Sequence, residues 1–437
     1  MTYRILSCDG GGVRGLMTAV WLTRLEQKLG GRLRDHFDLV AGTSTGSILA
    51  CAVSHGIPAE DIVSMYLQHG REVFPPLSDR FFGRLQRTLS DGVSAPKYDG
   101  IGLETVLQRV FGKTSFGDLE IRPTLVVSYD TFNRQALVFK NTRDIFASLP
   151  VWEVVRASCA APVYFPGHVM KIGRADVPLI DGGVVANNPT ACAVAEAVRC
   201  NWEAHGSDGP GIDDFVVASF GTGQTTRQIG IPQVRGWGGA EWILPVIDVI
   251  FDGVAGSVDY VAKQLLGDES YFRFQCKLEH AYDQMDNADP ANLNALVSTA
   301  EAYLLQGGER QLDQLVKALQ PATAAPTVRA TPSILPAAPR PATASGMSPR
   351  ATAASPGSSA FGPAVAPPIR PELAPPSRPT TPLVEPAADT DLQPIASVPS
   401  LSTVKPASAA TAGVKPPARG GDLVKLAFRR FRPDKAA

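Results

Sequence analysis

A strand, a tight turn and a helix are predicted by one stretch of the chain, Phe37-Asp-Leu-Val-Ala-Gly42-Thr-Ser44-Thr-Gly46-Ser-Ile-Leu-Ala-Cys-Ala-Val53. The run from Phe37 to Ala41 is short and apolar, as a buried strand is, and Ser47 to Val53 is an apolar helical segment. Between them lies the pattern G-x-S-x-G, whose two glycines remove the Cβ atoms that would collide in a tight turn. Helix N-terminal amides after such a turn point toward a developing negative charge. We therefore predict that Ser44 is a nucleophile.

A second glycine-rich segment, Gly10-Gly11-Gly12-Val13-Arg14-Gly15, follows an apolar strand at Tyr3–Ser7 and precedes a helical pattern from Leu16 to Leu29. Three consecutive glycines leave their backbone N–H groups unhindered, so this loop can bind an oxyanion. A dinucleotide-binding loop is the rival interpretation, because Asp35 or Asp38 lies about 20 residues further on. The serine turn on the next strand favours the oxyanion loop, since acyl transfer uses both motifs and a nucleotide site uses only one.

Arg14 and Asp181 are further candidates for the same site. Arg14 either adds positive charge to the glycine loop and contacts a substrate phosphate, or is an ordinary surface or ion-pairing residue at a helix start. Asp181 ends the short apolar run Val177-Pro-Leu-Ile-Asp181 and is followed by Gly182 and Gly183. A carboxylate at the carboxyl end of a strand lies where open α/β sheets place their sites, so Asp181 is a candidate base. By itself, an Asp-Gly pair also marks an ordinary turn.

Alternating strands and helices predict the fold class. The apolar runs at Thr124–Ser128 and Phe215–Ser219 have the length and composition of buried central strands. Hydrophobic residues make up 44% of the chain, which is enough for a large core. We expect a three-layer α/β/α sandwich around one mostly parallel sheet, followed by a disordered C-terminal tail.

Taken together, the motifs resemble those of the patatin-like phospholipase family, including its bacterial members. The family carries D-G-G-G-x-R-G, then G-T-S-T-G, then D-G-G or D-G-A, and this chain has Asp9-Gly-Gly-Gly-Val-Arg-Gly15, Gly42-Thr-Ser-Thr-Gly46 and Asp181-Gly-Gly183. Other similar segments are Asp35-His-Phe-Asp-Leu-Val-Ala41, Arg156-Ala-Ser-Cys-Ala-Ala-Pro162 and Asn187-Asn-Pro189. The resemblance covers roughly residues 3 to 310. Ser47 departs from the pattern, since plant patatins often have glycine there.

The resemblance implies a catalytic dyad without histidine, in which Ser44 is the nucleophile and Asp181 is its base. It also implies that three glycines and one arginine line the oxyanion loop, namely Gly10, Gly11, Gly12 and Arg14. The remaining motif glycines are Gly15, Gly42, Gly46, Gly182 and Gly183.

A free aspartate, with a pKa of about 3.9, is a weak base for an alcohol. Desolvation in a lipid-filled pocket raises that pKa, and an oxyanion hole stabilises the transition state before proton transfer is complete. The alternative is a Ser-His-Asp triad, for which His36, just before the serine strand, and His168, between the central motifs, are the candidates.

The predicted reaction is hydrolysis of an acyl ester of a membrane phospholipid or another acyl lipid, through an acyl-Ser44 intermediate, as in a phospholipase A. We expect neither a metal nor a cofactor, because no group of residues has metal-ligand spacing and no phosphate-binding lysine loop is present. Nucleic-acid binding is not expected either, since the aromatic residues are scattered and the first 320 residues are acidic. The alternative is a latent effector or binding protein whose lipolysis requires an activating ligand or partner, as in the bacterial family members that cyclic nucleotides or host proteins activate. The sequence does not identify such an activator.

Composition divides the chain near residue 320. Residues 321–437 hold 13 basic and 6 acidic side chains, whereas the first 320 residues hold 28 and 36. Of the 37 prolines, 22 lie between Pro321 and Ala418, where no periodic pattern is present. Such a segment cannot bury enough apolar surface to offset the entropy of ordering it. We expect a catalytic domain at 1–320, a Pro/Ala-rich disordered linker at 321–421 and a short basic amphipathic segment at 422–433.

The sequence also bears on localisation. The N-terminal residues contain no apolar run long enough for a signal peptide. The most hydrophobic later run, Trp242–Phe251, is shorter than the roughly 20 residues of a spanning helix and contains Pro245 and Asp248. We expect a cytoplasmic protein that contacts membranes only peripherally, with secretion independent of a signal peptide left open.

The basic segment at 422–433 generates a first prediction. Val424, Phe428 and Phe431 share one helical stripe, and basic residues occupy the adjacent one, as in helices that lie among lipid headgroups. Each basic residue near an anionic surface contributes roughly 1 kcal/mol, screened by salt. Deleting the residues after Gly420 should therefore reduce sedimentation with anionic vesicles at low salt. Unchanged and salt-insensitive binding by the deletion variant would contradict this, and would also fit a segment that binds the acidic domain or another protein.

Overall fold

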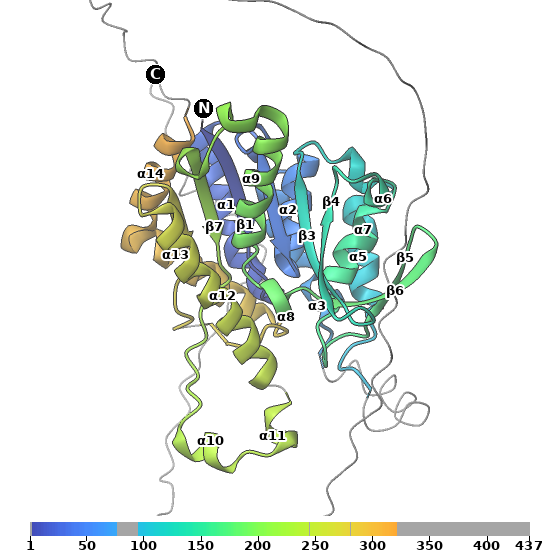
Figure 1. The fold of residues 1–437 in the computed structure, drawn as a ribbon. Helices are drawn as coiled ribbons and strands as arrows, with labels where there is room; N and C mark the ends of the chain where they lie inside the picture. The colour runs from blue at the N-terminus through green and yellow to red at the C-terminus, as the bar shows by residue number, and fades with distance from the viewer. Residues whose placement is uncertain (1, 77–94, 244, 280, 321–437) are drawn as a thin grey trace, which may run out of the picture. The chain divides into compact units, whose positions relative to one another are not determined.

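Apolar strands from distant parts of the chain form one sheet (Figure 1). The computed structural model describes residues 2–76, 95–243, 245–279 and 281–320, and within them eight strands join in the order β5-β6-β3-β2-β1-β7-β8, with β4 paired to β3. Five strands run in one direction and pair in parallel with one another: β1 (Tyr3–Cys8), β2 (Leu39–Thr43), β3 (Thr124–Asp130), β7 (Phe215–Phe220) and β8 (Tyr271–Phe274). The antiparallel side consists of β4 (Gln135–Lys140), β5 (His168–Ile172) and β6 (Ala175–Asp181).

Helices cover both faces of this sheet, which confirms the predicted three-layer sandwich. One face carries α9 (Thr190–His205) and the second half of α12 (Pro245–Leu266). The other face carries α1 (Gly15–Leu29), α2 (Thr45–His55), α3 (Ala59–Val73), α5 (Ile101–Phe111), α7 (Val151–Ser158), α13 (Pro290–Tyr303) and α14 (Glu309–Leu319). The described part also has four short α-helices, besides several 3-10 turns: α6 (Asp144–Ala147), α8 (Gly183–Ala186), α10 (Ile231–Gly236) and α11 (Gly239–Trp242).

Successive residues of the central strands alternate between two separate hydrophobic clusters. Ile5 and Leu39 pack in the cluster under α9, whereas Leu6 and Val40 pack in the larger cluster on the opposite face. All four side chains are fully buried. Because both faces are covered, these strands are continuous apolar runs and do not alternate between apolar and polar residues.

Two strands share one edge of β3, and this arrangement places the candidate site. β4 occupies the first edge of β3 along residues 125–130. β2 pairs with the second edge as far as Thr43, which lies opposite Val127. β6 pairs with residues 128–130 and must continue that second edge, with Asp181 opposite Ser128. The carboxyl ends of β2 and β6 therefore meet head-on, and the residue that follows Thr43 is Ser44.

Two further expectations concern the C-terminal segments and membrane-spanning helices. The predicted linker at 321–421 and the basic segment at 422–433 lie outside the described residues, so the domain boundaries stay predictions. No helix in the described part of the chain is long and apolar enough to cross a membrane.

Candidate active site

Ser44 occupies the strained turn that the G-x-S-x-G pattern predicts. It lies between β2 and α2 with φ 52° and ψ −126°, a conformation that residues other than glycine rarely adopt. A Cβ atom on Gly42 would lie 2.1 Å from the carbonyl oxygen of Gly46, and one on Gly46 would lie 2.1 Å from the carbonyl oxygen of Cys8. Both glycines are therefore needed for the strand, the turn and the helix to pack this closely.

Ser44 and Asp181 are in direct contact. Ser44 Oγ donates a hydrogen bond to Asp181 Oδ2 at 2.6 Å, and the N–H of Gly183 donates to Asp181 Oδ1 at 2.7 Å. Ser44 is 7% exposed and Asp181 is 0% exposed. Burial raises the pKa of Asp181 to about 7, although the hydrogen bonds from Ser44 and Gly183 act in the opposite direction. A carboxylate with a pKa near 7 is a stronger proton acceptor than an exposed aspartate.

The turn after β6 is packed as tightly as the serine turn. A Cβ atom on Gly182 would lie 2.2 Å from the carbonyl oxygen of Val127, and one on Gly183 would lie 2.6 Å from a buried phenylalanine ring. At the start of α1, a Cβ atom on Gly15 would lie 2.5 Å from Thr45 Oγ1. These motif glycines allow the segments around Ser44 to approach one another.

The glycine loop offers two amides to the site. The N–H of Gly10 donates to the carbonyl of Asn187 at 3.0 Å, so of the three glycines predicted to line the oxyanion loop Gly10 does not offer a free amide. Among the described residues, the N–H groups of Gly11 and Gly12 have no hydrogen-bond partner. The carbonyl of Gly10 accepts a hydrogen bond from Thr222 Oγ1 at 2.8 Å. In a trans peptide the C=O and the N–H point in opposite directions, so this bond turns the Gly11 N–H away from Thr222.

Arg14 holds the second peptide of the loop. Its Nε donates to the carbonyl of Gly11 at 3.2 Å, and its Nη1 donates to the carbonyl of Asp283 at 3.5 Å. The side chain is buried, so the interpretation of Arg14 as a surface residue is wrong. By the same trans geometry, the N–H of Gly12 points away from Arg14. A contact between Arg14 and a substrate phosphate stays a prediction.

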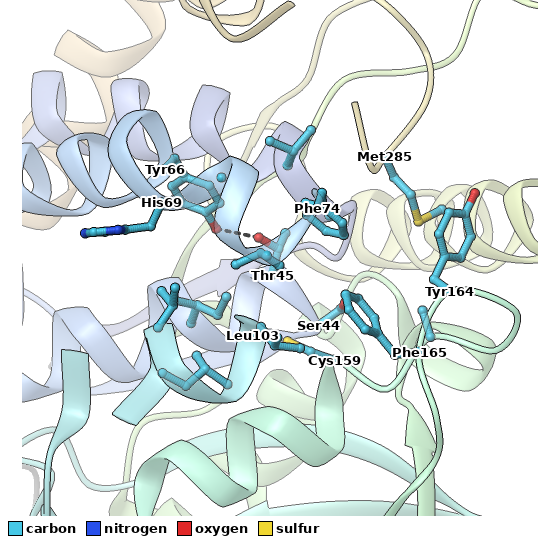
Figure 2. Close-up of a pocket in the computed structure, with 18 of the residues that line it drawn as sticks. Ser44, Thr45, Tyr66, His69, Phe74, Leu103, Cys159, Tyr164, Phe165 and Met285 are labelled. Carbon is cyan, nitrogen blue, oxygen red and sulfur yellow. Dashed lines mark hydrogen bonds between the residues drawn. The ribbon is translucent and has the colours of Figure 1, made fainter. Parts of the chain in front are cut away.

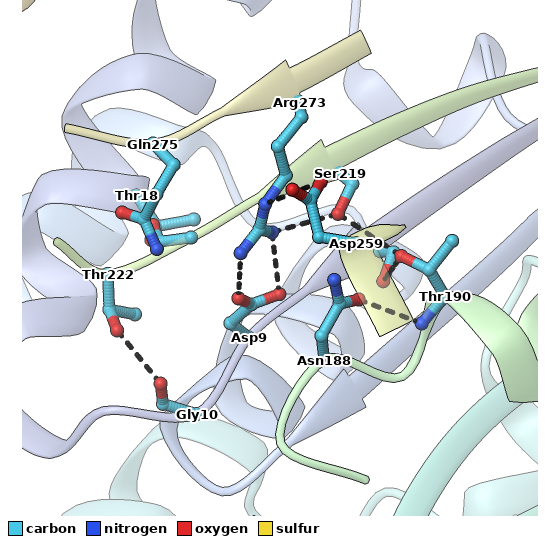
Figure 3. A network of polar contacts seen from close by, with 12 residues as sticks. Asp9, Gly10, Thr18, Asn188, Thr190, Ser219, Thr222, Asp259, Arg273 and Gln275 are labelled. Carbon is cyan, nitrogen blue, oxygen red and sulfur yellow. Dashed lines mark hydrogen bonds and ion pairs between the residues drawn. The ribbon is translucent and has the colours of Figure 1, made fainter. Parts of the chain in front are cut away.

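A buried ion pair supports the start of the loop (Figure 3). Arg273 on β8 donates to both carboxylate oxygens of Asp9, at 2.9 Å and 2.5 Å, and also to Ser219 Oγ at 2.9 Å. Asp9 immediately precedes Gly10, and the Asp9 N–H donates to the carbonyl of Phe220 at 2.9 Å. The loop is thereby tied to β7 and β8 before it reaches the site.

An apolar pocket opens beside Ser44 (Figure 2). Gly12, Val13, Ser44, Thr45 and Ile48 line one part of it, and the rest is formed by residues of α3, of α5 and of the segments around residues 159–165 and 285. The apolar lining consists of Val13, Ile48, Met65, Val73, Phe74, Leu103, Val106, Leu107, Cys159, Ala161, Phe165 and Met285. Its empty space, including the part open to solvent, is about 690 Å³. The serine is therefore reached through a pocket that suits a hydrocarbon chain.

Among the described residues, no histidine hydrogen-bonds to Ser44 or Asp181. His168 contacts Glu153 at 3.4 Å. His69 lines the apolar pocket, but its Nδ1 contacts Glu72 at 3.2 Å and Figure 2 shows its ring directed away from Ser44. The triad alternative finds no support in this geometry. The described residues also contain no group of three metal-ligating side chains.

Comparison with known proteins places the chain in a family. The model for the patatin-like phospholipase family matches residues 6–194. Patatin-like protein 1 of Arabidopsis thaliana is 31% identical over 337 residues, which cover 69% of this chain and 81% of the relative. The chain belongs to the patatin-like phospholipase family. It is thus a hydrolase of a lipid-degrading family, as the motifs indicated.

Proteins from other sources are also similar to this chain. The cGAMP-activated phospholipase of Pseudomonas aeruginosa is 34% identical over 286 residues, which cover 63% of this chain and 79% of the relative. Among solved structures, human GIVD cytosolic phospholipase A2 aligns with 73% of this chain and 60% of its own at 11% identity, with a TM-score of 0.36.

Two residues that support this patatin-like site were not predicted from the sequence. Ser158 Oγ accepts a hydrogen bond from the Ser44 N–H at 2.8 Å and donates to the carbonyl of Val127 at 2.6 Å, so it joins the serine turn to β3. Ser158 belongs to a segment that resembles the family, which was a usable signal. Arg273 carried no such signal, because its partner Asp9 lies 264 residues away in sequence.

The pair of Asp9 and Arg273 generates a prediction about stability. Removing one member of a buried ion pair leaves an uncompensated charge, so Arg273→Met should lower the free energy of unfolding by about 3–5 kcal/mol in urea titrations. Adding Asp9→Asn should restore part of the loss. The control is Arg71→Ala, which breaks an exposed pair with Asp289 and should have little effect. Equal, small losses for the two arginine variants would contradict a structural role for the buried pair.

Proposed function

We propose that the protein hydrolyses acyl esters of phospholipids by a phospholipase A-type reaction, with Ser44 as nucleophile and Asp181 as general base. One observation carries the proposal: the 2.6 Å hydrogen bond from Ser44 Oγ to Asp181 Oδ2 lies at a buried point of an apolar pocket. A strained serine, a carboxylate with raised pKa and a pocket for an acyl chain together suit the cleavage of a lipid ester.

The first half of the reaction forms an acyl-enzyme. Ser44 Oγ attacks the ester carbonyl carbon while its proton passes to Asp181 Oδ2, and the carbonyl electrons move to oxygen. The free N–H groups of Gly11 and Gly12, with the N-terminus of α2, supply the positive end of dipoles for that oxyanion. When the tetrahedral intermediate collapses, the bond to the leaving alkoxide breaks. The alcohol oxygen takes the proton from Asp181, and the acyl group stays on Ser44.

The second half releases the fatty acid. Water attacks the acyl-Ser44 carbonyl carbon and gives a proton to Asp181. The same backbone N–H groups stabilise the oxyanion that forms on the carbonyl oxygen. The bond to Ser44 Oγ then breaks, and Oγ takes the proton back. The reaction consumes one ester and one water and yields one alcohol and one carboxylic acid, so no cofactor enters the balance.

The direct test is a pair of substitutions. Ser44→Ala removes the attacking oxygen and should abolish hydrolysis of mixed phospholipids. Mass spectrometry of the products measures this hydrolysis. Asp181→Asn removes the base and should lower turnover by about 10²–10⁴-fold. A fluorophosphonate probe should label Ser44 in the wild type and no residue in Ser44→Ala.

Matched controls separate these effects from general damage. Ser257→Ala and Asp213→Asn change the same residue types at exposed positions and should retain wild-type activity. The proposal is contradicted if Ser44→Ala keeps more than about a tenth of wild-type activity. A loss on His36→Ala or His168→Ala as large as on Asp181→Asn would favour the triad instead.

The raised pKa of Asp181 predicts the pH dependence. The base works only as a carboxylate, and burial raises its pKa to about 7. The kcat/KM for a soluble ester should therefore rise with pH, reach half its maximum near pH 7 and level off above it. An activity that is already maximal at pH 5 would mean that Asp181 is not the titrating base.

A latent form of the same enzyme is the second candidate function. The observation in its favour is the similarity to a Pseudomonas relative whose name states activation by cGAMP. Measuring lipid release by the pure protein with and without cGAMP tests this candidate. Activity that appears only with cGAMP would favour the latent form, whereas equal activity in both would favour a constitutive enzyme.

A further inference from the structure

An apolar excursion separates β7 from α12. Residues 228–243, which we call the apolar loop, leave the body after Arg227, and Arg227 Nη2 lies 3.3 Å from Asp248 Oδ2 near the start of α12. This ion pair closes the neck of the loop. Figure 1 shows α10 and α11, which belong to the loop, standing apart from the body beyond one edge of the sheet. That edge is the carboxyl edge of the parallel strands, where Ser44 lies.

The neck of the apolar loop lies beside the mouth of the active-site pocket. The N–H groups of Thr226 and Arg227 donate to the carboxylate of Asp283 at 3.3 Å and 3.2 Å. Asp283 is two residues from Met285, which lines the pocket, and Figure 2 shows Met285 close to Tyr164 at one side of it. Burial raises the pKa of the Tyr164 hydroxyl; the charge of Asp248 acts in the same direction and that of Arg227 in the opposite direction.

The loop presents apolar side chains to solvent. Ile231 is 70% exposed, Val234 58% and Ile243 51%. Trp237 and Trp242 pack edge to face at 5.2 Å between ring centroids and are only partly buried. Its only charged residues are Arg235 and Glu241, which leave it without net charge. Among the described residues, 17 large hydrophobic side chains are exposed; three of them lie in the loop, and Val246 and Val249 follow near the start of α12. Exposed apolar side chains that gather in one segment mark an interaction site, whereas singly scattered ones do not.

We infer that the apolar loop inserts into the surface of a lipid bilayer and holds the mouth of the Ser44 pocket against the lipid. This inference rests on the proposed function, because it explains how an ester that resides in a bilayer reaches a buried serine. Tryptophan pairs with isoleucine and valine are typical of segments that enter the headgroup and upper acyl region. The loop carries no net charge, and its two charged side chains, Arg235 and Glu241, are exposed. Their charged groups can stay among the lipid headgroups, so insertion of the apolar side chains does not require them to be desolvated.

The chemistry of the loop also distinguishes this contact from the predicted role of the basic segment at 422–433. A basic helix requires anionic lipid and is weakened by salt. The apolar loop depends on burial of hydrocarbon, which salt does not screen. It should therefore bind vesicles of phosphatidylcholine alone, which carry no net charge.

The experiment measures sedimentation of the full chain with phosphatidylcholine vesicles at low and high salt. The Ser44→Ala background keeps the vesicles intact. Placing two carboxylates in the loop, Ile231→Asp with Val234→Asp, should weaken binding by roughly ten-fold or more, since each buried aliphatic side chain contributes a factor of that order. The matched control is Val198→Asp with Trp202→Asp, two exposed apolar residues of α9, and it should bind as the parent protein does. The single variant Trp242→Ala should give an intermediate loss.

A second readout separates this inference from the proposed function. With Ser44 intact, the loop variant should hydrolyse a soluble short-chain ester at the parent rate, which also shows that it folds. If the parent protein with Ser44 intact does not hydrolyse the soluble ester, the proposed function is contradicted, but the binding of the protein to vesicles is not. The inference is overturned if the parent does not bind phosphatidylcholine vesicles, if the loop variant binds as the parent does, or if the α9 control loses as much. A lipid-free dimer that the loop substitutions dissociate would overturn it too, because a second copy would then cover the loop.

Discussion

The hydrogen bond between Ser44 Oγ and Asp181 Oδ2 exists because β2 and β6 share one edge of β3. β2 ends opposite Val127 and β6 ends opposite Ser128, so the two residues at their carboxyl ends are brought together by strand register. The serine turn and the turn after Asp181 can form only because Gly42 and Gly182 lack a Cβ, which would lie 2.1 Å from the carbonyl oxygen of Gly46 and 2.2 Å from that of Val127. The chemistry of the site thus follows from a constraint of sheet geometry.

The same burial that raises the pKa of Asp181 reduces the stability of the fold. Its pKa is about 7 in the native state and about 3.9 in a free aspartate, so the native state holds the proton more tightly than the unfolded chain does. The cost of the buried charge is absent below about pH 4, grows as pH rises, and is complete above about pH 7. The carboxylate of Asp9, by contrast, has a full partner in Arg273. Within the described ranges, Asp181 therefore has no cation beside it near the serine, whereas the charge of Asp9 is balanced by Arg273 and holds the loop.

Much of this arrangement could be predicted from local sequence. The glycines around Ser44 and the apolar runs of the central strands act within a few residues, so they predicted the turn, the layers and the parallel core. The antiparallel approach of β6 depends on pairing between residues 128 and 181, which no local pattern encodes. The hydrogen bond from the Gly10 N–H to Asn187 and the ion pair of Asp9 with Arg273 each join residues more than 170 positions apart. The exposed face of the apolar loop was also not predicted, because an apolar run does not show whether it is covered.

The protonation of Asp181 itself tests the central claim most directly. Infrared difference spectroscopy of protein with isotope-labelled aspartate, with Asp181→Asn as the reference, follows the carboxylic acid band of this residue through a pH titration. The account predicts that the band of Asp181 disappears with a midpoint near pH 7, and that Ser44→Ala, which removes a hydrogen bond to the carboxylate, moves the midpoint upward. A midpoint near pH 4, typical of an exposed aspartate, would contradict the account, since Asp181 would then be neither desolvated nor a base matched to Ser44.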